Sequence, residues 1–257
     1  MASKKFYPVV KSSQLFNSTG APQNHRVVLV DRMLSKLNRR LYRQGRFYEV
    51  KIDIDPTQAS TIQVFALRND WAVHKAYQMA YNEYRENTAQ ERENLSKSMI
   101  ARWEDFKVDH GTTGTDISDP ALVDVAGNAA GLTSGEFNLA NVVDSSGSRR
   151  TFTWGTPGAT EYGILQEYDK SSNTPVTPPV VSNDAPYVEL DSEVNELTHD
   201  DLQGDNNTPP YAANDVASGS PFVKIAELKA DHANGTRLST GFFTAPCGII
   251  LITNVGS

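Results

Sequence analysis

The sequence predicts a mainly β protein: an antiparallel jelly-roll sandwich with inserted helices and a basic helix near the N-terminus. Two observations carry this prediction. About seven to nine short apolar or alternating runs are separated by Gly, Pro, Ser, Asn and Asp, as in antiparallel β proteins. A pair of helical patterns is inserted after the second of these runs. An α+β domain with one antiparallel sheet is the competing class, and 257 residues suffice for either as a single unit.

The chain begins with a segment that we interpret as an extended or docked arm. Residues 1–25 mix Ser, Asn, Pro and Gly with scattered apolar residues and show no helical or strand period. We therefore predict an N-terminal arm over residues 1–25 and a single jelly-roll domain over residues 26–257.

A basic amphipathic helix is predicted over residues 30–44. Val30, Leu34, Leu37 and Leu41 share one helical face, and Gly45 is a natural stop. Most of the basic side chains in this stretch lie off that apolar face. The stretch from residue 34 to residue 46 holds five of them: Lys36, Arg39, Arg40, Arg43 and Arg46.

Two strands and two helices are predicted next. Residues 46–55 alternate between apolar and charged side chains, which indicates a half-buried strand, and residues 61–67 form a second strand. Asp70 can cap a helix over residues 71–87. Thr88 and Glu91 have the spacing of a capping box, which predicts a further helix with Leu95, Met99, Trp103 and Phe106 on one face. The Tyr and Ala stripe of the first helix could stack nucleotides, but packing against a core is the favoured interpretation.

The rest of the chain is predicted to be β-rich with long connections. Two connections are long enough to be surface loops with a role of their own, residues 171–186 and residues 197–215. The predicted strand regions are 137–143, 150–154, 162–168, 187–190, 222–228, 240–243 and 248–253.

No catalytic, metal or cofactor site is predicted, so we do not expect an enzyme. The single cysteine, Cys247, cannot build a disulfide framework and is expected to be a small buried side chain. The histidines lack metal-ligand spacing, and the acidic loop 200–205 beside His199 matches no Ca²⁺ loop, although it could hold a cation. Asp53 and Asp55 are expected on a solvent-facing strand surface. A Walker loop and a GxSxG motif are both absent.

The charge is distributed unevenly along the chain. Residues 1–51 hold eleven Lys and Arg against two acidic residues, whereas the whole chain has a net charge of −7. Such asymmetry indicates one surface for a polyanion, with a solvated charged face as the alternative. The predicted nucleic-acid-binding residues are Lys4, Lys5, Lys11, Arg32, Lys36, Arg39, Arg40, Arg43 and Arg46.

Four stretches resemble capsid proteins of small non-enveloped viruses, most closely those of environmental circular Rep-encoding single-stranded DNA viruses. They are "RFYEVKIDID", "IQVFALRNDWAVHKAYQMAYNEY", "IARWEDFKVDHG" and "FFTAPCGIILIT". The resemblance covers roughly residues 26–110 and 237–253. One departure is that such proteins usually begin with a dense Arg-rich tail, whereas Lys4, Lys5 and Lys11 are the basic residues before residue 26.

The resemblance implies a structural coat protein that assembles with itself into an icosahedral shell. Residues 1–46 would face the enclosed nucleic acid, single-stranded DNA by this resemblance, and the two long loops would lie outside. The expected location is the virion, assembled in the host cytoplasm or nucleus, and no membrane partner or membrane-spanning run is expected. One alternative is a carbohydrate- or ligand-binding module of the lectin or adhesin kind, in which Trp103, Trp154 and the many tyrosines could form a stacking site. A hydrolase would need a carboxylate pair that we do not find.

Overall fold

The computed structural model describes residues 9–15, 25–55, 60–95, 103–123, 129–132, 135, 137–172, 220–230 and 237–256. The predicted strand at 187–190, the loop at 197–215, residues 173–186 of the other long loop, and Lys4 and Lys5 lie outside these ranges.

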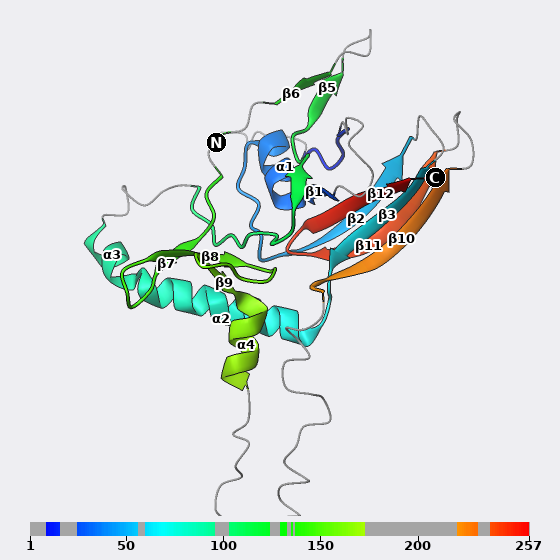
Figure 1. Ribbon diagram of the computed structural model, residues 1–257. Coiled ribbons are helices and arrows are strands. Elements are labelled where there is room, and N and C mark those ends of the chain that lie inside the picture. Colours follow the sequence, from blue (N-terminus) through cyan, green and yellow to red (C-terminus); the bar gives the residue numbers. More distant parts are fainter. Residues whose placement is uncertain are drawn as a thin grey trace, which may run out of the picture.

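The main sheet brings together strands from both ends of the chain (Figure 1). All of its pairs are antiparallel except β1 with β4, which is parallel. The first and last elements of the fold are therefore neighbours. The strand order is β10 (Phe222–Ala230), β3 (Ser60–Leu67), β12 (Ile249–Gly256), β1 (His25–Leu29) and β4 (Gly114–Asp116).

A second sheet consists of β2 (Phe47–Ile54) paired antiparallel with β11 (Leu238–Pro246). Every second side chain of β2 is turned inward, and Tyr48 and Val50 pack against a cluster that includes Val64 and Ile250 of the main sheet. Two sheets with apolar faces in contact are consistent with the predicted β-sandwich.

Six strands pair in a nested order along the sequence: β1, β2, β3, β10, β11 and β12. β1 pairs with β12, β2 with β11, and β3 with β10, while β3 also pairs with β12. Each outer pair encloses the inner pairs along the sequence. This arrangement places strands that are far apart in the chain side by side.

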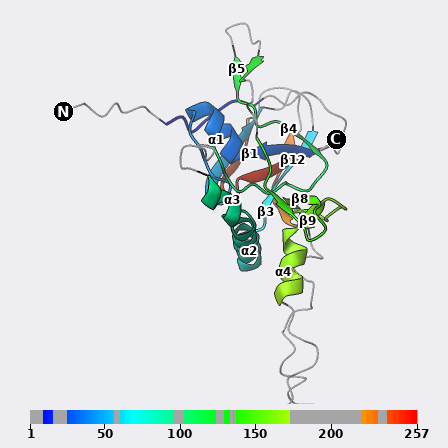
Figure 2. The ribbon, with the colours of Figure 1, turned by 90° about the vertical axis from the view of Figure 1, so that its left-hand side faces the viewer.

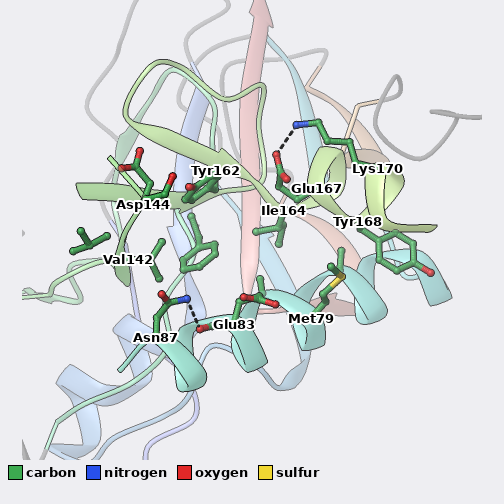
Figure 3. Close-up of a pocket in the computed structure, with 15 residues that line it drawn as sticks. Met79, Glu83, Asn87, Val142, Asp144, Tyr162, Ile164, Glu167, Tyr168 and Lys170 are labelled. Atoms are coloured by element: carbon green, nitrogen blue, oxygen red, sulfur yellow. Dashed lines mark hydrogen bonds and ion pairs between the residues drawn. The ribbon is translucent and has the colours of Figure 1, made fainter. Parts of the chain in front are cut away.

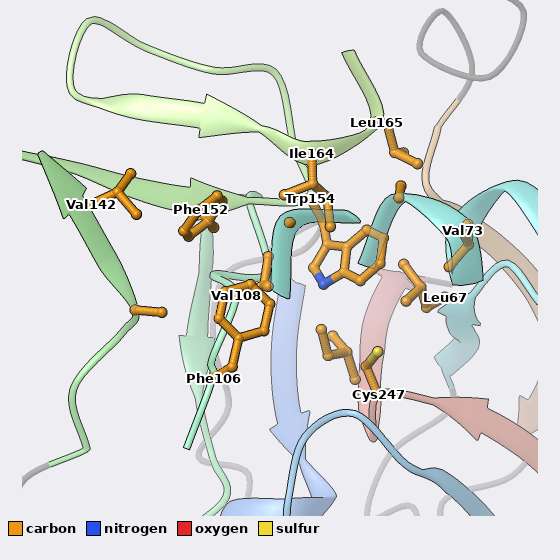
Figure 4. Packing of buried hydrophobic residues seen from close by; sticks show 14 residues of the cluster. Leu67, Val73, Phe106, Val108, Val142, Phe152, Trp154, Ile164, Leu165 and Cys247 are labelled. Carbon is orange, nitrogen blue, oxygen red and sulfur yellow. The ribbon is translucent and has the colours of Figure 1, made fainter. Parts of the chain in front are cut away.

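A second apolar core lies beside the sandwich, under helix α2 (Trp71–Asn87). Trp154 is 1% exposed, and Figure 4 shows its indole among Leu67, Val73 and Ile164. Figure 2 shows α2 and α4 together, away from the β5 end of the molecule. The elements around this core are β7 (Asn141–Val143), β8 (Arg149–Thr153), β9 (Glu161–Gly163) and α4 (Ile164–Ser172).

Helix α2 forms as the sequence predicts. The Asp70 carboxylate accepts a hydrogen bond from the Val73 amide at 2.8 Å, which satisfies a free donor of the first turn. Ala76 and Ala80 are buried on the same face, and Tyr77 packs edge-on against Phe106 with ring centroids 5.2 Å apart. The Tyr and Ala stripe therefore packs on a core.

The strands predicted at 46–55, 61–67, 222–228 and 248–253 are confirmed. One other predicted element was wrong, and one is shorter than predicted. The predicted strand 162–168 is β9 followed by α4, because Ile164 and Leu165 are buried on one side of a helix. The helix that begins at residue 89 ends at Asn94. At the start of this helix, the Thr88 hydroxyl does not cap the first turn. It donates instead to the Tyr84 carbonyl of the preceding helix, at 2.7 Å.

The predicted basic helix is shorter than expected. α1 spans Val30–Asn38, and Arg39 adopts a left-handed conformation with φ of 47°. The chain then folds back, since the Ser35 hydroxyl accepts a hydrogen bond from the Tyr42 amide at 2.9 Å. Residues 39–44 are thus a turn and not a continuation of the helix. Strands β1, β4, β5 (Ala121–Val123) and β6 (Ala129–Gly131) were not predicted.

We expect Ile250→Ala to destabilise the fold by about 2–5 kcal/mol, because it removes a fully buried side chain between the two sheets. Ile225→Ala on β10 is the matched control. That side chain is 38% exposed, so its loss should cost about 1 kcal/mol or less. Urea unfolding would measure both, and equal losses would contradict the packing described for Ile250.

Candidate nucleic-acid interface

Three of the predicted nucleic-acid-binding cations form ion pairs inside the subunit. Arg32 pairs with Asp116 and Lys36 with Asp119, and Nη1 of Arg43 lies 3.3 Å from Asp105. All three carboxylates come from residues 105–119, which include β4. Phosphate groups would have to displace these aspartates to reach Arg32 or Lys36.

The surroundings of Lys36 also make its charged form less stable than that of an exposed lysine. Partial burial, and secondarily the neighbouring Arg32, lower the pKa of Lys36 to about 8. The ion pairs with Asp116 and Asp119 largely offset the positive charge on the face of α1 that carries Arg32 and Lys36.

The remaining described cations gather where α1 ends. The Val10 amide donates to Oδ1 of Asn38 at 2.8 Å, and Nδ2 of Asn38 donates to the Val10 carbonyl at 2.9 Å. This two-point contact fixes the arm against the last residue of α1, so Lys11 is held near the point where Arg39 and Arg40 leave the helix. We call Lys11, Arg39 and Arg40 the arm–helix patch.

The arm–helix patch is suited to anions. All three residues are exposed, and within the described part of the chain none of them forms an ion pair. The guanidinium of Arg40 lies over the Tyr42 ring, 6.0 Å from its centroid. The C-terminal end of α1 carries a partial negative charge, which stabilises positively charged side chains at this position. Arg46 is exposed further along the same turn, whereas Lys4 and Lys5 lie outside the described residues.

A buried polar contact fixes the turn that carries these cations. The Gln44 side chain donates to the Val108 carbonyl at 2.9 Å and accepts from the Val108 amide at 2.6 Å. The backbone amide of Gln44 also donates to Oδ2 of Asp105 at 2.9 Å. Sequence reasoning missed this anchor because it joins residues more than sixty positions apart and has no local signal.

Next to this anchor lies a cluster of buried charges. Asp31 and Lys107 are almost completely buried, and the Lys107 ammonium lies 2.9 Å from the centroid of the Phe137 ring. Burial raises the pKa of Asp31 to about 7, against the opposing effects of the nearby backbone amides and of Lys107. Burial also raises the pKa of Asp105 and lowers that of Lys107. Neither carboxylate oxygen of Asp31 has a well-aligned hydrogen-bond partner in the described residues.

Among the described residues, Cys247 and Asp53 lie in surroundings that disfavour their action as a nucleophile or a general base. Cys247 is buried, and burial raises its thiol pKa. Asp53 lies 3.3 Å from Lys51 and 2.7 Å from Arg237; a hydrogen bond from Ser239 chiefly lowers its pKa, and the two cations contribute. Nowhere in the described ranges do three His, Cys, Asp or Glu side chains gather as metal ligands would.

A cleft of about 540 Å³ lies between α2, α4 and the β7–β8 hairpin (Figure 3). Apolar side chains such as Met79 and Val142 line it, and Glu83 and Asp144 lie on it as well. Asp144 is held by Arg150 at 2.7 Å. Of the two tryptophans assigned to a stacking site in the lectin alternative, Trp154 is buried in the core and cannot stack on a ligand, whereas Trp103 is 53% exposed.

Comparisons with known proteins give no assignment. No known protein family matches this chain, no curated protein is detectably similar to it, and no solved structure matches it. Of the helices in the described residues, none combines the length and apolar character that crossing a bilayer requires.

The buried Asp31 should make stability depend on pH. Between about pH 4 and pH 7 the folded protein retains a proton on Asp31 that the unfolded chain has released, since the pKa rises from 3.8 to about 7 on folding. The stability linked to this proton is full below pH 4 and is lost as the pH rises to 7. In Asp31→Asn, which stays neutral, this loss should disappear, so the variant should gain a few kcal/mol relative to the wild type between those limits.

Urea unfolding measured across this pH range would test the expectation. Asp55→Asn, which makes the same substitution at an exposed carboxylate, is the matched control. Parallel pH curves for Asp31→Asn and the wild type would contradict the assignment of Asp31 as a buried titrating group.

Proposed function

We propose that this chain is a structural coat protein that self-assembles into an icosahedral shell and encloses single-stranded DNA. The observation that carries the proposal is the nested pairing of β1 with β12, β2 with β11, and β3 with β10. The arm–helix patch and the exposed apolar side chains add to it. The protein is proposed to be non-enzymatic and to reside in the virion.

The nested pairing supports a jelly-roll topology for this chain. In that fold one long antiparallel hairpin is rolled up, so the eight strands pair first with last, second with seventh, third with sixth and fourth with fifth. The three pairs formed by the six strands named above match three of these four pairs. The β3–β12 pair joins the β1–β12 pair to the β3–β10 pair in the main sheet. The fourth pair would come from residues between β3 and β10. A fold alone does not determine a function, so the surfaces must carry the rest of the argument.

The surface of the subunit favours association with other proteins. Phe242 is 77% exposed, Trp71 is 59% exposed and Phe47 is 56% exposed. Large aromatic side chains are costly to leave in water and are enriched at protein interfaces. In the two-stranded β2–β11 sheet, neither outer edge pairs with another described strand. Copies of the same chain would cover these surfaces in a shell.

Nucleic acid would be bound through the arm–helix patch and Arg46. Exposed Lys and Arg side chains bind phosphates without regard to sequence, and an acidic remainder keeps nucleic acid away from the other surfaces. Arg32, Lys36 and Arg43 contribute less in this proposal than the sequence predicted, because each of them already has an aspartate partner.

A small-ligand-binding module is the second candidate, and the cleft between α2 and α4 is the observation that favours it. Its volume and its mixture of apolar walls with a few polar groups are typical of ligand sites. Such a module would be a monomer or a small oligomer and would not retain nucleic acid.

The purified protein should form large particles. Size-exclusion chromatography and negative-stain microscopy would detect them, and an absorbance ratio shifted towards 260 nm would report enclosed nucleic acid. A monomer at all salt concentrations and pH values would contradict the shell and favour the ligand-binding module.

Replacing the arm–helix patch by Lys11→Glu, Arg39→Glu and Arg40→Glu together should weaken single-stranded DNA binding and reduce the slope of its salt dependence by about 0.7 for each lost phosphate contact. The matched control changes three exposed cations elsewhere, Lys75→Glu, Arg149→Glu and Lys229→Glu, and so alters the net charge equally. Fluorescence anisotropy at several salt concentrations measures both. An equal loss in the two triple variants would show that net charge, and not the patch, governs binding.

A further inference from the structure

We propose that two copies of this chain associate through the free edge of β2, which pairs antiparallel with β2 of the second copy about a two-fold axis at Val50. The inference rests on the proposed self-assembly and names one of its contacts. It is argued from the hydrogen-bonding direction of β2 and from the order of its charges.

Within the described residues, no strand pairs with the outer edge of β2. β11 is the one described strand that pairs with β2. Thr240 of β11 contacts both backbone groups of Ile52, accepting from its amide at 3.1 Å and donating to its carbonyl at 3.4 Å. The backbone of Ile52 therefore points towards β11. Because the direction alternates along a strand, the amides and carbonyls of Glu49 and Lys51 point to the free edge.

The charges on the outward face of β2 alternate in sign. Glu49, Lys51 and Asp53 occupy successive outward positions, while Val50 and Ile52 are turned towards the main sheet. Edge strands often carry charge as a protection against pairing with another molecule. Charges of one sign would repel a second copy, but alternating charges can be complementary to themselves.

One antiparallel register makes them complementary. With Val50 opposite Val50 of the second copy, Glu49 lies opposite Lys51 and Lys51 lies opposite Glu49, which gives two cross-strand pairs of opposite charge. The residues whose backbones face the free edge are then also opposite one another, so the ladder hydrogen bonds can form. On the inward face Tyr48 lies opposite Ile52.

The neighbouring registers are unfavourable. Centring the pair on Lys51 places Lys51 opposite itself and Glu49 opposite Asp53. Centring it on Glu49 places two glutamates together, and centring it on Ile52 places Glu49 opposite Asp55. Registers shifted by a single residue would turn outward side chains to the inner face. The register at Val50 is the one of these that sets no like charges opposite each other.

A charge-reversal cycle tests the proposal. Glu49→Lys and Lys51→Glu should each weaken self-association about tenfold or more, because both cross-strand pairs become like-charged. The double variant Glu49→Lys/Lys51→Glu restores opposite charges and should associate like the wild type. An equimolar mixture of the two single variants should also associate, since each one complements the other. Sedimentation velocity at low salt measures these four samples and the wild type.

The mixture of the two single variants distinguishes loss of the contact between copies from loss of contacts within one subunit. Glu49 accepts a hydrogen bond from Thr244 at 2.6 Å, and Lys51 lies 3.3 Å from Asp53, so a single variant also loses an internal contact. Mixing two variants cannot restore an internal contact, but it can restore a contact between copies. Equal association of all samples, or single variants that stay apart when mixed, would overturn the proposal, as would a wild-type protein that is monomeric at every concentration.

A disulfide provides a second readout. Val50 would form a non-hydrogen-bonded pair with itself, where the two Cα atoms lie about 4.5 Å apart, a separation that a disulfide can span. Val50→Cys should therefore form a covalent dimer under oxidising conditions. Ile52→Cys, on the same face, would lie far from its own counterpart and should not; equal cross-linking of both would overturn the register. The buried Cys247 is present in both variants.

The shell and this contact can fail independently. Large particles whose formation is insensitive to the charge-reversal cycle would overturn the β2 contact and leave the shell standing. A dimer that obeys the cycle but forms no larger particle would overturn the shell and leave the β2 contact standing.

Discussion

The insertion of β12 between β1 and β3 is the constraint on which the rest of this structure depends. Ile249, Ile250 and Leu251 at its start are almost completely buried, so this strand is central to the main sheet. The turn before it also contacts α1, because the Val30 amide donates to the Gly248 carbonyl at 2.8 Å. Gly248 has a φ of 67°, and a side chain there would contact Tyr48 and Val30. One corner therefore fixes the main sheet, the start of α1 and the inner face of β2.

The fold also determines which basic residues remain available. The arrangement of β4 beside β1 carries Asp116 and the following Asp119 to α1, where they neutralise Arg32 and Lys36. The turn after α1 is fixed to residues 105–108 through Gln44, and it presents Arg39, Arg40 and Arg46 to solvent. Counting charges along the sequence identifies a basic segment, but the distribution of aspartates in space decides which part of it faces outward.

The sequence predicts those elements whose signal is local. β2 and β3 follow from alternation, and α2 follows from its apolar period and the Asp70 cap. Residues 162–168 were misassigned because a short apolar run does not distinguish a strand from a helix, and burial of Ile164 and Leu165 on α2 decided for the helix. β1 is five residues long and continues directly into α1, so it has no separate pattern. The aspartate partners and the contact of Asn38 with Val10 join distant residues, and no local period encodes them.

The central position of β12 has a consequence for biosynthesis. This strand follows every other described element along the chain, yet β1 and β3 depend on it as their shared neighbour. Closure of the main sheet must therefore wait until residue 256 has emerged from the ribosome, however early the other strands are made. Long-range strand pairing of this kind is intrinsically slow, and incompletely folded chains expose apolar surface that chaperones bind.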